Sequence, residues 1–307
     1  MNADWVAASV RARSMAQRRA GTARCREVAG APPLAAGLAL LAGPLYGPRL
    51  AALREDAPAE HAVRATTLWQ LRVLGGWIPA SGSTLARALA AEYEAENLLA
   101  LAERLREGTG SPTADLDLGA LATAWPRARE ARAMDDLAEV LRASRWGAID
   151  DQSALRDLLT LSRLGRLAGE SVTARPWAKA EAGLLAARLL LVDAATPSPR
   201  LRQLARPLLG DRWAGAASLA ELRAALPRPA AAALAGIDDA SDLWRAEARQ
   251  HATVEADAFR LLRGALPGPD VVLGGATVLA VDAWRVRAAL AAAATGAGGS
   301  EVLDAVA

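Results

Sequence analysis

Residues 91–107 read AEYEAENLLALAERLRE, and they contain Tyr93 and Asn97, one of the two tyrosines and one of the two asparagines in the chain. The other positions are alanine, leucine, glutamate and arginine, which are strong helix formers. A spacing of four residues places Tyr93 and Asn97 on one helical face, and Arg104 follows seven residues later. A mid-helix asparagine costs roughly several tenths of a kcal/mol relative to alanine. We therefore expect Asn97 to bond an adjacent loop or helix end, while Tyr93 packs in the core.

The composition of the whole chain predicts an all-α protein. Hydrophobic residues make up 52% of the 307 residues but aromatic residues only 4%, so alanine and leucine supply most of the apolar surface. Both favour helices, whereas the β-branched and aromatic residues that favour strands are scarce. No segment shows a convincing strand alternation. The length alone is typical of about two domains.

The charge pattern gives little reason to expect a nucleic-acid partner. The formal net charge is +2, and Lys179 is the only lysine among 36 basic residues. This bias towards arginine and alanine indicates a GC-rich coding sequence. Basic residues gather between Arg11 and Arg26, but no aromatic residues alternate with them to stack bases. We interpret this region as a solvated face or as a surface for an acidic partner.

Several features of the sequence indicate a cytoplasmic protein with at most a peripheral contact to the membrane. Cys25 is the only cysteine, which excludes an internal disulfide. The first residues, MNADWVAASVRARS, lack the apolar core of a signal peptide. The longest uncharged run, residues 29–48, contains four prolines and four glycines, which argue against a membrane span.

Helical periodicity runs through most of the chain. Asn2 is predicted to cap a first helix that carries Trp5, and the Pro32–Pro33 pair is predicted to open a short helix. Longer helices are predicted over 59–77, 91–107, 170–195, 239–264 and 270–294. Loop signals at 108–112 and 196–200 divide the chain into three parts. These parts are residues 1–110, 111–197 and 198–307, the last of which ends in a tail that begins at about residue 296.

The long helices of the three parts share a spacing of polar residues. The corresponding residues are Tyr93, Asn97 and Arg104 in the first part, Trp177, Glu181 and Arg188 in the second, and, more weakly, Asp282 and Arg285 in the third. An internal threefold repeat is one interpretation. Chance similarity in a chain of biased composition is the other.

Two acidic clusters offer a different function. Their acidic residues are Asp135, Asp136 and Glu139 in DDLAE, and Asp238, Asp239 and Asp242 in DDASD. In an all-α chain the pair resembles the aspartate-rich motifs with which isoprenyl diphosphate synthases bind Mg²⁺. The lysines that such enzymes use for diphosphate are essentially absent, and so is the arginine pair that usually follows the first motif. Because both clusters stand at expected helix starts, capping is the competing interpretation.

Other catalytic chemistry has no support in the sequence. No phosphate-binding loop of the G-x-x-x-x-G-K-[ST] type occurs. His61 and His251 lie far apart in the sequence and Cys25 has no companion, so a zinc site is poorly supported. A nucleophilic triad requires a histidine near a positioned serine or cysteine, and a satisfied or exposed histidine is the competing interpretation for both histidines. The nine tryptophans do not cluster, and we expect most of them to fill a core of small residues. We predict no catalytic, cofactor-binding or metal-binding residues and no cofactor.

The sequence resembles the family of C/d subunits of rotary V/A-type ATPases over nearly its whole length. YEAENL at 93–98, with an arginine seven residues after the asparagine, is similar to the repeat helix of that family. WVAASVRAR at 5–13 is similar to its opening helix, with Ser9 in place of an arginine, and DAWRVR at 282–287 to its closing helix, with Arg285 in place of an asparagine. The residues that match the family motifs are Trp5, Arg11, Arg13, Tyr93, Asn97, Arg104, Asp282 and Arg287. The departures at Ser9 and Arg285 indicate a divergent member of the family from a high-GC bacterium.

The resemblance implies three similar helical domains arranged as a funnel around a pseudo-threefold axis. It also implies a non-catalytic central-stalk subunit that couples the rotating shaft to the membrane proteolipid ring for ion transport. The expected partners are the shaft, the proteolipid ring and other V/A-ATPase subunits, and the expected location is the inner face of the cell membrane. A Mg²⁺-dependent isoprenyl-type enzyme and a generic helical scaffold remain the alternatives.

Overall fold

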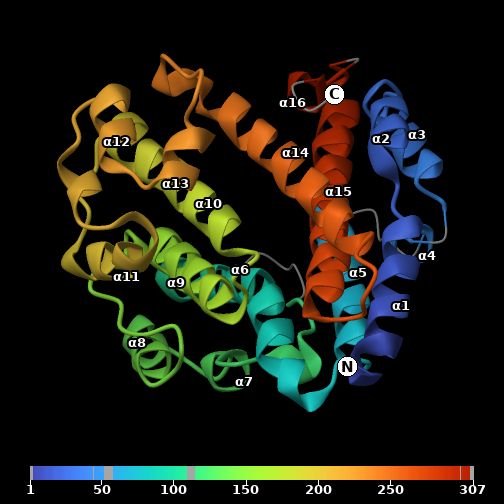
Figure 1. Ribbon diagram of the computed structural model, residues 1–307, viewed down its shortest axis with the longest axis horizontal. Helices are drawn as coiled ribbons and strands as arrows, with labels where there is room; N and C mark the ends of the chain where they lie inside the picture. Colours follow the sequence, from blue (N-terminus) through green and yellow to red (C-terminus); the bar gives the residue numbers. More distant parts are fainter. Residues whose placement is uncertain (1–2, 44, 52–57, 109–114, 298, 305–307) are drawn as a thin grey trace. The chain divides into compact units, whose positions relative to one another are not determined.

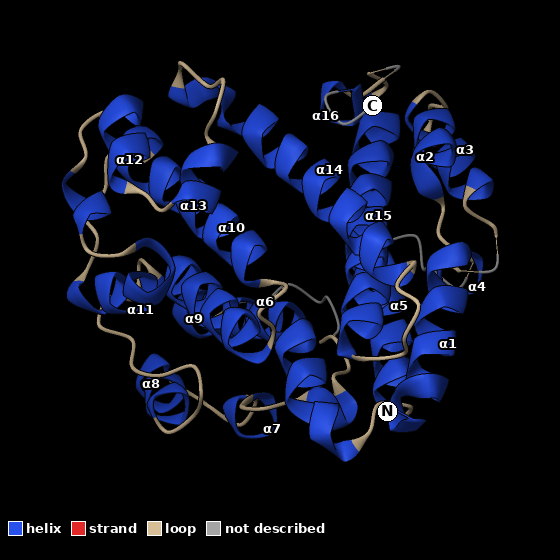
Figure 2. Ribbon diagram, in the orientation of Figure 1, coloured by secondary structure: helices blue, strands red, loops and turns tan. Residues whose placement is uncertain are grey.

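The structure, a computed structural model, describes residues 3–43, 45–51, 58–108, 115–297 and 299–304. Helices are the only regular secondary structure in these ranges, and no strand occurs among them (Figure 2). The prediction of an all-α protein is therefore confirmed. The predicted cap at Asn2 lies outside the described residues.

The chain forms two compact units, each assembled from separate stretches of sequence. The first unit comprises Met1–Ala86, Thr113–Ala120 and His251–Ala307, and the second comprises Arg87–Pro112 and Leu121–Gln250. Two long helices, α6 (Ser83–Glu107) and α14 (Leu243–Leu262), contribute residues to both units. The three contiguous repeats predicted from the sequence, with boundaries after residues 110 and 197, stay a prediction.

The helices of the first unit surround one long helix, α15. They are η1 (Ala3–Trp5), α1 (Val6–Gln17), α2 (Gly21–Ala29), α3 (Leu34–Leu40), α4 (Gly47–Leu50), α5 (Ala59–Gly75), η2 (Ala80–Gly82), α15 (Pro269–Thr295) and α16 (Glu301–Asp304). Four of them, α1, α2, α3 and α5, pack directly on α15 (Figure 1). The short helix α16 forms within the segment that was predicted to be a tail.

The second unit is built from shorter helices around α10. They are α7 (Trp125–Ala128), α8 (Met134–Arg142), α9 (Leu155–Glu170), α10 (Arg175–Ala187), the π-helical turn η4 (Arg188–Val192), α11 (Pro199–Leu209), η5 (Arg212–Gly215), α12 (Leu219–Ala225), α13 (Arg228–Ala233) and η6 (Ala240–Asp242). A further turn, η3 (Gly119–Leu121), lies where the two units join in sequence. The helix predicted over 170–195 begins later, at Arg175, because Pro176 favours the first turn of a new helix.

Small residues allow the helices of the first unit to approach very closely. A Cβ atom added to Gly275 on α15 would lie 2.7 Å from the Cβ atom and 2.9 Å from the carbonyl oxygen of Ala12 on α1. Similarly, Gly82 accommodates the ring of Trp5, whose nearest atom would lie 2.3 Å from an added Cβ atom. These glycines are therefore packing requirements, since no larger residue fits without moving a neighbour.

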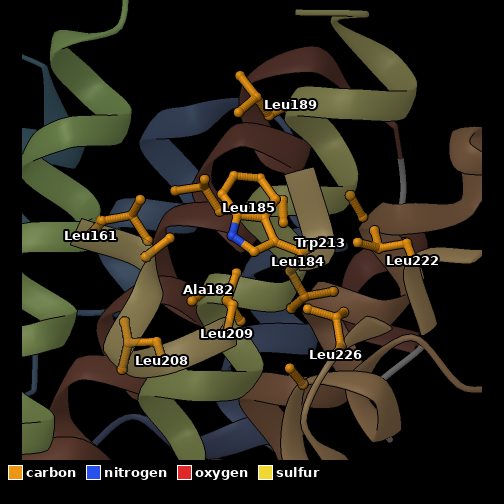
Figure 3. Close-up of a cluster of buried hydrophobic side chains, with 14 of the residues drawn as sticks. Leu161, Ala182, Leu184, Leu185, Leu189, Leu208, Leu209, Trp213, Leu222 and Leu226 are labelled. Carbon is orange, nitrogen blue, oxygen red and sulfur yellow. The ribbon is translucent and has the colours of Figure 1, made fainter. Parts of the chain in front are cut away.

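Trp213 lies in the core of the second unit, and only 1% of it is exposed (Figure 3). Leucines of α9, α10, α11 and α12 surround its ring, among them Leu161, Leu185 and Leu208. Five tryptophans, namely Trp5, Trp125, Trp146, Trp177 and Trp213, are buried as predicted. Trp69 and Trp77, in contrast, are exposed.

None of the helices in the described ranges is both long enough and apolar enough to cross a bilayer.

The close crossing of α1 and α15 makes a testable prediction. Gly275→Ala should lower the free energy of unfolding by about 1–3 kcal/mol, because the added methyl group meets backbone atoms that cannot yield locally. Urea denaturation followed by circular dichroism measures the change. Gly165→Ala in α9 is the matched control, since its Cβ atom would meet nothing within 4 Å. The control should leave stability unchanged or raise it by up to about 1 kcal/mol. Equal effects at both positions would contradict the packing account.

Candidate functional site

The residues that match the family motifs are mostly buried. Tyr93 and Asn97 are each 3% exposed, so the face of α6 that carries them is turned into the protein as predicted. Trp5 and Asp282 are buried as well. The four arginines are half-buried: Arg11, Arg13, Arg104 and Arg287. Two of the helices that carry these residues also carry a buried carboxylate, Glu94 on α6 and Asp282 on α15.

The first buried carboxylate belongs to Glu94 on α6, which is 1% exposed. Its Oε1 accepts hydrogen bonds from three consecutive backbone N–H groups, at 2.6 Å (Thr123), 2.7 Å (Ala124) and 2.9 Å (Trp125). Its Oε2 accepts one from the Thr123 hydroxyl and one from Nε1 of Trp146, the latter at 3.0 Å. The side chain thus caps the start of α7 and also binds the loop beyond α8. We call Glu94 and its donors the first clamp.

The sequence around Glu94 explains why this arrangement requires so many donors. Buried alanines and leucines flank Glu94 along α6, and an ion in such surroundings is costly unless its hydrogen-bonding capacity is filled. Five donors meet that requirement without a direct ion pair. The ring of Trp146 also contacts a cation, since the guanidinium carbon of Arg166 is 5.0 Å from the ring centroid. Burial lowers the pKa of Arg166, and Glu94 opposes that shift.

The second buried carboxylate, Asp282 on α15, makes the same kind of contacts in the first unit. It is 0% exposed and accepts hydrogen bonds from the backbone N–H groups of Ala20 at 3.0 Å and Gly21 at 2.7 Å. Its Oδ2 also accepts the hydroxyl proton of Tyr46 at 2.8 Å. Burial raises the pKa of Asp282, and these three hydrogen bonds oppose that shift. We call Asp282 and its donors the second clamp.

The two clamps share one design. Each is a buried carboxylate in the middle of a long helix, and each binds the backbone at the start of a helical segment and an aromatic side chain at its end. The first clamp closes residues 123–146 in this way, and the second closes residues 20–46. Glu94 precedes Asn97 by three positions, as Asp282 precedes Arg285. The register in which the sequence suggests a repeat is therefore also the register of the two clamps.

An ion pair forms at the position three residues after Asp282 and at the corresponding position of α10. Arg285 on α15 pairs with Glu255 on α14 through two contacts of 2.5 Å each, and the Arg285 side chain is only 2% exposed. In the second unit, Glu181 on α10 pairs with Arg163 on α9. Each pair joins a long helix to the helix before it in sequence, and the charges are reversed between the two. An ion pair at this position therefore occurs in both units, with the charges exchanged.

The middle long helix, α10, lacks a clamp. The position that corresponds to Glu94 and Asp282 is Ala178, which is fully buried. The start of α11 is instead held by Asp150, which accepts hydrogen bonds from the Ser198 hydroxyl at 2.9 Å and from the backbone N–H of Arg200 at 2.8 Å. A carboxylate close to α11 in the sequence thus caps the start of this helix.

Residues of the opening helix α1 hold the connection between α14 and α15. Arg13 donates to the carbonyl oxygens of Leu262 at 2.9 Å and Gly264 at 2.7 Å, where α14 ends. Ser9, which stands in place of a family arginine, accepts the backbone N–H of Gly268 at 3.1 Å just before α15 begins. Arg13 and the hydroxyl of Ser9 therefore both bind the backbone of this connection.

The two acidic clusters act at helix starts. Asp136 accepts hydrogen bonds from the backbone N–H groups of Arg132 at 3.0 Å and Ala133 at 3.1 Å, just before α8. Asp239 caps η6 by accepting from the N–H of Ser241 at 2.8 Å. Within the described ranges, no group of three or more histidine, cysteine, aspartate or glutamate side chains is placed to hold a metal ion. Capping thus accounts for one aspartate in each cluster.

The histidines and the cysteine serve in packing. His251 stacks on Trp284, with ring centroids 4.2 Å apart. His61 is half-buried, and burial lowers its pKa. Cys25 lies within α2 and is completely buried, and burial together with the charge of Asp282 raises the pKa of its thiol to about 12.

Sequence reasoning missed the two residues on which the site depends most. Glu94 lies within the matched motif but was not among the residues predicted to form a site. Its place directly after the buried Tyr93, on a helix whose neighbouring positions are buried, is the signal that could have identified it. Glu255 carries no such signal, because α14 contains several acidic and basic residues that are equally spaced for surface pairs. Only the partner, Arg285, distinguishes it.

The first clamp predicts a large cost for an isosteric change. Glu94→Gln should lower the free energy of unfolding by about 2–4 kcal/mol, because the glutamine NH2 group replaces Oε2 and cannot accept the hydrogen bonds of the Thr123 hydroxyl and of Nε1 of Trp146. Urea denaturation followed by tryptophan fluorescence measures the change. Glu103→Gln, at an exposed position of the same helix, is the control and should lie within about 0.5 kcal/mol of the wild type. A neutral result for both variants would show that the clamp does not stabilise the second unit.

The buried ion pair predicts a non-additive pair of substitutions. Arg285→Met alone should cost about 3–5 kcal/mol, because it leaves the Glu255 carboxylate without its buried partner. Adding Glu255→Gln should restore a substantial part of that loss, since no unpaired charge then remains. Thermal and urea denaturation of the two single variants and the double variant complete the cycle. Simple addition of the two single effects would contradict the pairing.

Comparison with known proteins identifies no relative. No protein-family model matches the chain, and no curated protein matches it significantly. The geometry of the site and the motif resemblance are therefore the grounds on which a function is assigned.

Proposed function

We propose that this protein is a non-catalytic central-stalk subunit of a V/A-type rotary ATPase. In this role it couples the rotating shaft to the membrane proteolipid ring for ion transport. The observation that carries the proposal is the recurrence of one carboxylate clamp, at one register, on α6 and α15. The carboxylates of both clamps, Glu94 and Asp282, lie within the stretches that resemble the repeat helix and the closing helix of the C/d family.

The recurrence supports an internal repeat on physical grounds. A buried carboxylate in an apolar helix is expensive, so it persists only where specific donors meet it. Two such residues with the same sequence of donors, first backbone and then an aromatic side chain, are hard to obtain by chance. The middle helix α10 shares the ion-paired position at Glu181 while Asp150 replaces its clamp. Three related segments of this kind are what a funnel of three similar domains around a pseudo-threefold axis requires.

The mechanical task of such a protein fits the packing within each unit. A coupling element must transmit torque with little elastic loss, so its helices need to be packed tightly. Gly275 against Ala12 in the first unit and Gly183 against Ala230 in the second bring helix backbones into direct contact, with an added Cβ atom 2.7 Å and 2.9 Å from the neighbouring Cβ atoms. Close-packed interiors have low compressibility and transmit strain.

The partners that follow from this proposal are the central shaft, the proteolipid ring and the other subunits of the complex. The protein then resides at the inner face of the cell membrane as a peripheral component, and it needs no cofactor and no active site of its own. The isoprenyl-type alternative gains no support, because Asp136 and Asp239 already serve as caps. A generic helical scaffold does not account for the repeated clamp.

The direct test is capture of the complex from native membranes. The tagged protein is extracted with a mild detergent, purified, and analysed by mass spectrometry beside an extract of untagged cells. We expect nucleotide-binding A and B subunits, the shaft and a proteolipid to copurify, and the purified chain alone to bind the shaft without hydrolysing ATP.

Recovery of the chain alone, from the soluble fraction, would overturn the proposal. An accompanying assay of Mg²⁺-dependent turnover of isoprenyl diphosphates separates the enzyme alternative. Turnover that disappears in Asp239→Ala would favour that alternative, and its absence in the wild-type protein would remove it.

A further inference from the structure

The second clamp holds both ends of one segment, residues 20–46, which we call the strap. It contains α2 and α3 and ends at Tyr46, just before α4. We propose that the strap is a separately opening element of the first unit and that Asp282 is the latch that keeps it closed on α15. This inference does not depend on the proposed function.

The latch has an unusual geometry, because one side chain ties the beginning and the end of the same segment. Ala20 and Gly21 donate to Asp282 from the start of the strap, and the hydroxyl of Tyr46 donates from its end. All three bonds are between 2.7 and 3.0 Å long and converge on a carboxylate that is 0% exposed. Loss of the carboxylate therefore frees both ends of the strap in one step.

The start of the strap has the backbone of a hinge. Gly21 adopts a φ of 75°, a left-handed conformation that glycine reaches at little cost, and a Cβ atom there would meet nothing within 4 Å. The chain therefore turns from α1 into α2 at a residue whose backbone conformation favours glycine. The helix before it, α1, ends at Gln17 and is held independently on α15 by the close contact of Ala12 with Gly275.

The strap is also packed on α15 through apolar contacts of α2 and α3. Cys25 and Val28 are the fully buried side chains of α2, and Gly37 of α3 lies so close to Ala293 of α15 that an added Cβ atom would be 3.2 Å away. The opposite face of α2 is exposed and carries the surface pair of Arg24 with Glu27. Leu41, Leu45 and Tyr46 near the end of the strap are buried as well, so closing combines apolar burial with the polar ties at the two ends. Figure 1 shows α2 and α3 along one side of α15.

Charges around the latch come from several elements, and their balance favours the closed state only while all donors are present. Arg285 on α15 and Arg19 at the end of α1 act on Asp282 or its surroundings from the positive side. Glu255 on α14 offsets Arg285 through its ion pair. If Tyr46 no longer donates, the buried carboxylate loses one of three hydrogen bonds. The open state, in which water can bind the carboxylate, then gains relative to the closed one.

Cys25 provides a built-in reporter for this opening. It is the only cysteine in the chain, it lies within the strap, and it is completely buried when the strap is closed. Its raised thiol pKa, about 12, leaves almost no reactive thiolate in the closed state at neutral or mildly alkaline pH. Reaction of Cys25 with an excess of a thiol reagent under native conditions therefore measures how often the strap opens.

The experiment compares the rate of modification of Cys25 by 5,5′-dithiobis(2-nitrobenzoic acid) at pH 8 in the wild type and three variants. Tyr46→Phe removes the tie at one end of the strap, and Asp282→Ala removes both ties. We expect modification to be at least about tenfold faster in Tyr46→Phe than in the wild type, and faster still in Asp282→Ala. Glu94→Gln breaks the first clamp in the second unit and is the matched control, so its rate should equal that of the wild type.

Hydrogen exchange followed by mass spectrometry gives a second reading on the same proteins. Peptides from residues 20–43 should exchange faster in Tyr46→Phe, while peptides from α15 and from the second unit keep their wild-type protection. Wild-type rates of modification in both Tyr46→Phe and Asp282→Ala would overturn the proposal. An equal acceleration in Glu94→Gln would also overturn it, since Cys25 would then react through unfolding of the whole chain. If Asp282→Ala does not fold, Tyr46→Phe and its exchange pattern decide.

Discussion

A carboxylate buried in the middle of a long helix sets the main constraint on this fold. Glu94 on α6 and Asp282 on α15 are each almost fully removed from water, and neither forms a direct ion pair among the contacts that the described residues show. The desolvation of an ion in such a position costs several kcal/mol unless donors converge on it. Backbone N–H groups that precede short helices supply them, since those groups lack partners within their own helices. The requirement of the carboxylate and the requirement of the helix start are met by the same bonds.

This constraint also explains how short helices become part of a stable unit. The helices α2, α3, α7 and α8 are between four and nine residues long, and isolated helices of that length are marginal in water. Each clamp fixes where such a segment starts and ends against a long helix. The apolar contacts then have a defined register, and small residues such as Gly275 and Gly183 allow the long helices to approach their neighbours closely. A stiff, alanine-rich body of this kind is suited to transmit force, which is the task of the proposed central-stalk component.

Much of the fold follows from local chemistry and was predictable from the sequence. The all-α class, the burial of Tyr93 and Asn97 and the capping role of Asp136 all follow from composition, spacing and helix-end preferences. The donors of the clamps were not predictable, because Trp146 and Tyr46 are distant in sequence from the carboxylates that they bind. The same holds for Glu255, whose surroundings on α14 offer many similar charges. Helix bounds were wrong where a proline in a first turn started a new helix, as at Pro176.

Electron cryomicroscopy of the complex that the tagged protein captures from its own membranes tests the central claim most directly. The account predicts that the chain lies between the shaft and the proteolipid ring, folded as three related segments built on α6, α10 and α15. The carboxylates of Glu94 and Asp282 should then occupy equivalent places in two of those segments. A chain found outside the rotor, or three long helices unrelated by any pseudo-threefold axis, would contradict it.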